Sequence, residues 1–182
     1  KIEGPDEVKW TFDGEAYSGN YILTGVPTGK YALAFPEVPG WTAPQSPTVE
    51  IAKDKTVAIV GKYVRHTGAV TAKIDGPGEA TWIFEGKDYK SGHKVDGVPT
   101  GKYAVAFSEV PEWTRPADVS IEITKGGTAS PEGKYIRHSG SLTANIDGPK
   151  EARWIFGGKE YESGQKAEGI PTGRHTVSFS DV

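Results

Sequence analysis

The chain has 182 residues, no cysteine and no methionine, and its 21 basic and 24 acidic residues give a formal net charge of −3. The absence of cysteine excludes disulfides as a source of stability. The charges are interspersed, and without a basic run they argue against binding to nucleic acid or to an anionic membrane. No run of about 18 apolar residues occurs, so no transmembrane helix is predicted in this segment.

One unit of sequence recurs along the chain with a fixed period. Tryptophan returns in the same phase at Trp10, Trp82 and Trp154 (82 − 10 = 72 and 154 − 82 = 72). A fixed period of this length is typical of proteins that use one small folded unit in series. Because the chain also lacks an initiator methionine, we expect it to be an internal or processed piece of a longer protein.

The period predicts three domains of the same fold. The first is residues 1–66 with its first strand truncated, the second is residues 67–138, and the third is the first half of a unit at residues 139–182. A unit of this size buries only a marginal core. We therefore expect contacts between neighbouring units to add stability.

The complete second repeat is rich in alternating segments. Apolar residues alternate with polar or small ones in four stretches, at residues 70–74, 80–84, 103–107 and 119–123. This alternation predicts strands with one buried face, and Gly- and Pro-containing turns separate them. No long stretch of the chain has apolar residues at the period of an α-helix. The sequence predicts an all-β chain of tandem small antiparallel β-sandwich domains, Ig-like or transthyretin-like, with a 72-residue repeat.

Short segments join the units, and neither contains a Gly/Ser-rich or Pro-rich linker. Each carries an Arg-His pair, Arg65 with His66 and Arg137 with His138. One interpretation is that these side chains hydrogen-bond the neighbouring unit. The other is that each pair is solvated at the end of a strand. In either case the short connection predicts a stiff series of units.

Two further tryptophans, Trp41 and Trp113, fall in segments bounded by proline, which indicates loops. A loop tryptophan exposed to solvent can stack on a sugar ring or on a partner side chain. Alternatively, these rings fold over the open end of each sandwich and plug its core. We prefer the plug, because small domains depend on large aromatic side chains for their cores.

The chain has none of the patterns that support enzymatic chemistry or metal binding. There is no glycine-rich phosphate loop, no calcium loop and no set of residues with metal-ligand spacing. His175 occupies a position that is tyrosine in the other repeats, so a structural role is expected for it. We expect no catalytic, cofactor or metal site, and no enzymatic activity.

A Pro-Thr-Gly turn recurs once in each repeat, with threonine at Thr28, Thr100 and Thr172. Proline fixes its own φ and glycine supplies positive φ, so turn geometry explains the motif. The three hydroxyls are also candidate acceptors for O-glycans on a surface loop.

Two segments of the second repeat carry a family resemblance. They are residues 74–86, Ile-Asp-Gly-Pro-Gly-Glu-Ala-Thr-Trp-Ile-Phe-Glu-Gly, and residues 99–107, Pro-Thr-Gly-Lys-Tyr-Ala-Val-Ala-Phe. The pattern resembles the PEGA-type repeats of bacterial surface proteins and, more loosely, carboxypeptidase-regulatory-like and transthyretin-like sandwiches. The chain departs from the usual form at Trp82 and Trp154. The resemblance implies extracytoplasmic, non-enzymatic modules for display, adhesion or scaffolding.

These observations favour a structural role. We expect a segment of a bacterial or archaeal fibre, filament or adhesin stalk at the cell surface, built as a rigid rod of head-to-tail domains. Its partners would be neighbouring repeats or further copies. The third unit is either cut from a longer chain or completed by strand addition from another subunit. The alternative is a multivalent module that binds carbohydrate or cell wall through Trp41 and Trp113, with avidity from repetition.

Overall fold

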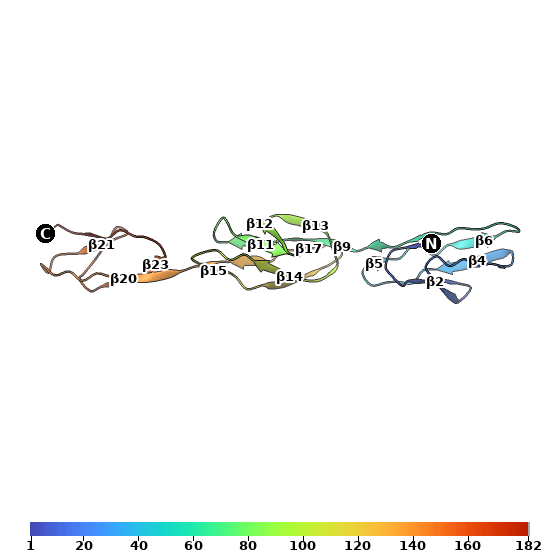
Figure 1. The fold of residues 1–182 in the computed structure, drawn as a ribbon, viewed down its shortest axis with the longest axis horizontal. Coiled ribbons are helices and arrows are strands. Elements are labelled where there is room, and N and C mark those ends of the chain that lie inside the picture. Colours follow the sequence, from blue (N-terminus) through green and yellow to red (C-terminus); the bar gives the residue numbers. More distant parts are fainter. Residues whose placement is uncertain (182) are drawn as a thin grey trace. The chain divides into compact units, whose positions relative to one another are not determined.

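The computed structural model describes residues 1–181, and all regular structure in this part of the chain is β-strand (Figure 1). The all-β prediction is confirmed. The alternation that predicted the strands is visible in burial: in β11 (Thr81–Phe84), Trp82 and Phe84 are buried while their neighbours are half-buried. No helix among the described residues is long and apolar enough to cross a membrane.

The strands follow the sequence repeat. Those of the first repeat are β1 (Ile2–Glu3), β2 (Lys9–Phe12), β3 (Glu15–Ser18), β4 (Gly29–Ala34), β5 (Trp41–Thr42), β6 (Thr48–Ile51), β7 (Gly61–Lys62) and β8 (Val64–Arg65). Those of the second are β9 (Thr67–Thr71), β10 (Lys73–Asp75), β11, β12 (Lys87–Lys90), β13 (Lys94–Pro99), β14 (Gly101–Phe107), β15 (Trp113–Thr114), β16 (Val119–Ile123), β17 (Thr128–Ala129), β18 (Glu132–Lys134) and β19 (Ile136–Arg137). Those of the third are β20 (Ser139–Thr143), β21 (Trp154–Phe156), β22 (Lys159–Tyr161), β23 (Lys166–Pro171) and β24 (Ser178–Phe179).

The residues form two compact units that do not coincide with the repeats. Unit 1 comprises Lys1–Val70, Lys94–Tyr103 and Ile121–Ala129. Unit 2 comprises Thr71–His93, Ala104–Ser120 and Ser130–Val182. Each junction between successive repeats therefore lies inside one unit. The repeat boundaries at residues 66/67 and 138/139 remain a prediction.

Unit 1 contains a four-stranded sheet in the order β3-β2-β4-β6, with antiparallel pairing throughout. Its buried core is formed by five side chains of the first repeat: Phe12, Leu33, Phe35, Val49 and Tyr63. The unit also contains the sheet β13-β9-β17 and the pairs β1-β7 and β5-β8.

The corresponding sheet of the second repeat has the order β12-β11-β14-β16. In unit 2, Trp82 pairs with Tyr89 on one side and with Phe107 on the other, and its side chain is fully buried. The third repeat contributes the sheet β22-β21-β24 and the pair β20-β23. Trp154, Ala167 and Ile170 form the buried part of its core.

Three strand pairs are parallel, namely β1-β7, β10-β18 and β9-β17. The expectation of antiparallel sandwiches did not anticipate them. Parallel neighbours need a long connection, and here most of a repeat supplies it. In each pair, a strand near the start of a repeat meets a strand near its end. A repeat therefore closes fully only when both of its halves are present.

Candidate functional site

Three of the predicted site residues, Trp41, Arg65 and His66, lie together at the junction of the first two repeats, inside unit 1. β5 pairs antiparallel with β8, which places Trp41 opposite Arg65. The backbone N–H of His66 extends this pairing by donating to the carbonyl of Gly40 at 2.7 Å. Trp41 therefore lies in a two-residue strand, as Trp113 does in β15, and the expectation that both lie in loops was wrong. A strand of two residues is too short to show the alternation of apolar and polar residues from which strands are predicted.

The side chains of the Arg-His pair turn back to their own repeat. The Arg65 guanidinium carbon lies 5.7 Å from the centroid of the Trp41 ring, within the range of a cation–π contact. Nε2 of His66 lies 2.9 Å from Oγ1 of Thr42. Nζ of Lys125, from the second repeat, donates to the same Oγ1 at 3.2 Å. Because Lys125 can only donate, Oγ1 of Thr42 accepts from it, while donor and acceptor between Thr42 and Nε2 of His66 depend on the tautomer of the ring.

The backbone of the histidine makes the connection to the next repeat. β8 ends at Arg65 and β9 begins at Thr67, so His66 alone separates the two strands. Its N–H is bound by its own repeat, while its carbonyl accepts the N–H of Thr100 from the second repeat at 3.1 Å. Both backbone groups of the connecting residue are thus satisfied, one on each side of the junction.

The same geometry recurs at the second junction, inside unit 2. Trp113 pairs with Arg137, whose guanidinium carbon lies 5.8 Å from the ring centroid. Oγ1 of Thr114 lies 3.0 Å from Nε2 of His138. The His138 carbonyl accepts the N–H of Thr172 at 3.0 Å, and His138 alone separates β19 from β20. The junction is therefore a repeated structural element.

The second repeat holds the segment around Trp113 with an additional ionic clamp. Arg115 donates from Nε to Glu109 at 2.8 Å and from a terminal nitrogen to Asp118 at 2.7 Å. Hydrogen bonds to Asp118 and Glu109 raise the pKa of this guanidinium above its ordinary value. The equivalent of Arg115 in the first repeat is Ala43, so the clamp is not needed for the pairing itself.

Both junction tryptophans are half-buried. Trp41 packs against the core of the first repeat, and Arg65 lies over its ring. This placement favours a packing role over presentation of the ring to a sugar. It matches the preferred interpretation that the tryptophan covers the end of a core.

The candidate glycan acceptors differ in accessibility. Thr28 is exposed, whereas Thr100 and Thr172 are half-buried. The two half-buried threonines are the ones whose N–H groups bind the preceding repeat. The Pro-Thr-Gly turn therefore has a junction role that its composition did not reveal.

His175 substitutes for tyrosine with the same hydrogen bond. Its Nε2 lies 2.6 Å from the carbonyl of Pro171. The hydroxyls of Tyr31 and Tyr103 donate to the equivalent carbonyls of Pro27 and Pro99, at 3.0 and 2.9 Å. This geometry is that of a structural position.

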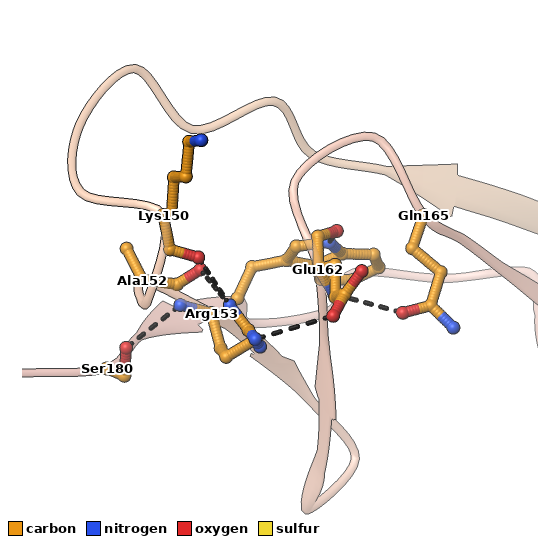
Figure 2. Close-up of polar contacts among 7 residues, drawn as sticks. Lys150, Ala152, Arg153, Glu162, Gln165 and Ser180 are labelled. Atoms are coloured by element: carbon orange, nitrogen blue, oxygen red, sulfur yellow. Dashed lines mark hydrogen bonds and ion pairs between the residues drawn. The ribbon is translucent and has the colours of Figure 1, made fainter.

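A polar cluster around Arg153 fixes one side of the third repeat (Figure 2). The Arg153 N–H donates to Oγ of Ser180 at 2.9 Å, and its guanidinium donates to the carbonyls of Lys150 and Ala152. The guanidinium also reaches Glu162 at 3.4 Å. The cluster joins the turn before β21 to the end of β22. Glu162 also connects the cluster to the core, because its carbonyl accepts from Nε1 of buried Trp154 at 2.9 Å.

The third repeat also contains a cavity of about 420 Å³, which the sequence analysis did not locate. It is lined by residues that include Leu142, Phe156, Ile170, His175 and Val177. Phe179 is 58% exposed, whereas the equivalent Phe107 is 3% exposed. No group of three or more His, Cys, Asp or Glu side chains that could hold a metal is found within residues 1–181.

Comparison with solved structures supports the fold. The chain is similar to the Bacillus anthracis TIE protein, with a TM-score of 0.57 and 17% sequence identity. The similarity covers 97% of this chain but only 42% of that one. At this identity the likeness shows an all-β fold and does not carry function. No protein-family model and no curated protein matches the sequence.

Proposed function

We propose that this chain is a segment of an extracellular, non-enzymatic structural protein of the cell surface, in which β-sandwich repeats are joined in series as a stiff rod. The observation that carries the proposal is the single-residue connection at each junction. His66 and His138 are each bonded backward through N–H and forward through C=O. This recurrence supports a chain whose successive repeats are held in a fixed relation.

The chemistry of the junction suits a protein that resists mechanical extension. The strand that ends one repeat continues almost directly into the strand that begins the next, and no flexible linker intervenes. Both described junctions use the same Trp-Thr and Arg-His partners. With a junction of this kind, each further repeat is added through the same interface as the one before it.

The resemblance to PEGA-type repeats supports a position at the cell surface, as part of a fibre, filament or adhesin stalk. The half-burial of Trp41 and Trp113 gives the glycan-binding alternative no specific support.

Immunogold electron microscopy of cells that produce the parent protein tests the proposal. Antibodies raised against residues 67–138 should label extended structures outside the cell envelope. Label confined to the cell interior would contradict the surface role. Label on the surface without any extended structure would contradict the fibre or stalk.

A further inference from the structure

Parallel strand pairs join the start of the complete second repeat to its end. β9 and β10, which begin this repeat, pair in parallel with β17 and β18, which precede its exit strand β19. In unit 1, residues 128–129 lie opposite residues 69–70. In unit 2, residues 132–134 lie opposite residues 73–75. The strands that open the repeat are therefore bonded directly to strands that close it.

The parallel direction decides how these pairs respond to tension along the chain. A pull on the preceding repeat acts on the amino end of β9, and a pull on the following repeat acts on the carboxyl end of β18 through β19. In a parallel pair, the amino end of one strand and the carboxyl end of the other lie at opposite ends of the ladder. Tension therefore slides the strands along each other and loads their hydrogen bonds together. Strands pulled apart from the same end would instead lose one bond at a time.

In unit 1, hydrogen bonds connect β9 to the turn that leads into β17. The Ala69 N–H donates to the carbonyl of Gly127 at 2.8 Å, and the Gly126 N–H donates to the carbonyl of Thr67 at 2.8 Å. The two segments also approach closely, because an added Cβ at Gly68 would meet the carbonyl oxygen of Gly127 at 2.6 Å. The first residues of the repeat are thus held at its far end before the chain continues into β10.

In unit 2, hydrogen bonds fasten both ends of the β10-β18 pair. The Lys73 N–H donates to the carbonyl of Pro131 at 3.1 Å, and the Tyr135 N–H donates to the carbonyl of Asp75 at 2.9 Å. The Tyr135 hydroxyl also donates to the carbonyl of Ser108 at 2.6 Å. Its side chain is buried, so the tyrosine anchors the end of β18 in the core as well as in the ladder.

Glycines fix the register of β10 and β18 against sliding. The Phe107 ring lies so close to Gly133 that an added Cβ would collide with it. Tyr135 packs on Gly76, where an added Cβ would meet the tyrosine Cβ at 2.7 Å. A slip of two residues, which keeps the same face of β18 toward the core, would bring Pro131 or Tyr135 to the place of Gly133. Sliding is therefore opposed by collision with a buried ring as well as by hydrogen bonds.

The first repeat builds the equivalent pair from β1 and β7. The Gly61 N–H donates to the carbonyl of Lys1 at 2.9 Å, and the Tyr63 N–H donates to the carbonyl of Glu3 at 2.8 Å. The Phe35 ring packs on Gly61 as the Phe107 ring packs on its glycine. The parallel pair is therefore a property of the repeat and not of one copy.

We infer that the parallel pairs β9-β17 and β10-β18 form a mechanical clamp, through which tension crosses the repeat. Hydrogen bonds between the opening and closing strands carry the load directly. Residues 76–125 lie between these strands in the sequence, so they carry no tension until the clamp breaks. The clamp, rather than the strand pairs in the middle of the repeat, sets the rate of unfolding under force. This inference deepens the proposed function, and it rests on that function only for the source of the tension.

Single-molecule measurements at constant force on the full 182-residue chain test the inference. The chain has no cysteine, so a pair of introduced cysteines determines where the handles attach. Thr67→Cys with Ser139→Cys, the 67/139 geometry, pulls the opening and closing strands in opposite directions along the ladder. Gly78→Cys with Ser139→Cys, the 78/139 geometry, pulls the carboxyl ends of β10 and β18 apart. All three positions are exposed, and an added Cβ at Gly78 meets nothing within 4 Å.

At the same force, the 67/139 geometry should unfold at least about tenfold more slowly than the 78/139 geometry, because its hydrogen bonds break together and not in turn. The gain in contour length identifies the event. The 67/139 geometry releases 72 residues (139 − 67), about 240–260 Å, and the 78/139 geometry releases 61 residues (139 − 78), about 200–220 Å. Equal rates in the two geometries would overturn the inference.

Lys73→Pro tests the assignment to β10-β18 in the 67/139 geometry. Lys73 is the first residue of β10, where a strand tolerates proline, but the bond from its N–H to Pro131 is lost. Unfolding should accelerate about fivefold, as expected for the loss of about 1 kcal/mol. Lys87→Pro is the matched control, since Lys87 is also the exposed first residue of a strand, but β12 lies at the edge of its sheet beside β11. Equal acceleration by both variants would contradict the assigned clamp.

The force measurement is independent of the microscopy. Equal unfolding rates in the two geometries, with extended structures labelled outside the cell, would remove the clamp and leave the proposed function. Slower unfolding in the 67/139 geometry, for a protein found only inside cells, would remove the proposed surface role and leave the clamp.

Discussion

At the scale of single residues, close contacts between glycine and aromatic rings close each complete repeat. Gly133 supports Phe107, and Gly76 supports Tyr135. These contacts join β18, near the end of the repeat, to β10 and β14, which precede it. The core of so small a unit therefore depends on the absence of a few side chains as much as on the presence of others.

Gly133→Ala should lower the free energy of unfolding of the second repeat by about 1–3 kcal/mol, because its Cβ overpacks the core against Phe107. Urea unfolding monitored by tryptophan fluorescence measures the change. Gly78→Ala is the control, since an added Cβ there meets nothing within 4 Å. Equal stability of the two variants would show that the second repeat adjusts freely at β18.

Alkaline pH should destabilise the first repeat through Tyr63. Burial raises the pKa of this phenol above its ordinary value of 10.0. The stability that Tyr63 contributes is therefore complete below about pH 10 and is lost as pH rises through the higher folded-state pKa. Tyr63→Phe should show a smaller fall in thermal midpoint between pH 8 and about pH 11 than the unaltered chain.

The thermal midpoint of Tyr63→Phe at pH 8 is the control for the effect of the substitution itself. There the variant lacks only the hydrogen bond from the hydroxyl to the carbonyl of Pro36, which contributes about 1 kcal/mol. An unchanged slope above pH 10 would mean that Tyr63 does not contribute to the alkaline transition.

At the scale of elements, the junction combines short strands with a cation–π contact. β5 and β8 have two residues each, so their pairing depends on the side chains of Trp41, Thr42 and His66. The same dependence holds at the second junction. At the first junction, the carbonyl of His66 accepts from the second repeat, whereas the side chains of Arg65 and His66 contact their own repeat.

Trp113→Ala should destabilise the second repeat by about 2 kcal/mol or more, because a half-buried indole is lost from the end of the core. Arg137→Ala should cost less, about 0.5–1 kcal/mol, since it removes only an exposed cation–π partner. Urea unfolding ranks the two variants. If Trp113→Ala kept full stability but abolished binding to cell-wall polysaccharide, the glycan-binding alternative would replace the packing role.

The sequence predicted the strands well where alternation was long. The segments at residues 80–84 and 103–107 became β11 and β14 because one face of each is buried. Alternation of apolar and polar residues identifies the buried face of a strand but not its partner strand. The parallel strand pairs therefore could not be predicted from the sequence. Likewise, the tyrosine in the other repeats predicted a structural His175, whereas nothing local in Pro-Thr-Gly indicated that Thr100 binds His66.

At the scale of the whole molecule, the same junction occurs between the first and second repeats and between the second and third repeats. Each repeat needs both halves to bury its phenylalanine, and each connecting histidine is bonded on both sides.

Insertion of Gly-Ser-Gly between His66 and Thr67 should let the first two repeats move more freely against each other. The inserted residues lengthen the segment that joins the repeats, so the hydrogen bond from the Thr100 N–H to the His66 carbonyl no longer restrains them. Single-molecule energy transfer between dyes on residues 30 and 102 should then show a broader distance distribution. The same insertion between Glu85 and Gly86, in a hairpin turn, is the control and should leave the distribution narrow. Equal widths would indicate that the junction does not restrict motion.

The most direct test of the central claim is the alignment of backbone N–H vectors in the unaltered chain. Residual dipolar couplings should be collected separately for residues 9–51 and 81–123 in a weakly aligning medium. The account predicts that the two repeats align with the same strength, as parts of one stiff segment. Markedly weaker alignment in one of them would show that the repeats reorient independently, and it would contradict the proposed rod.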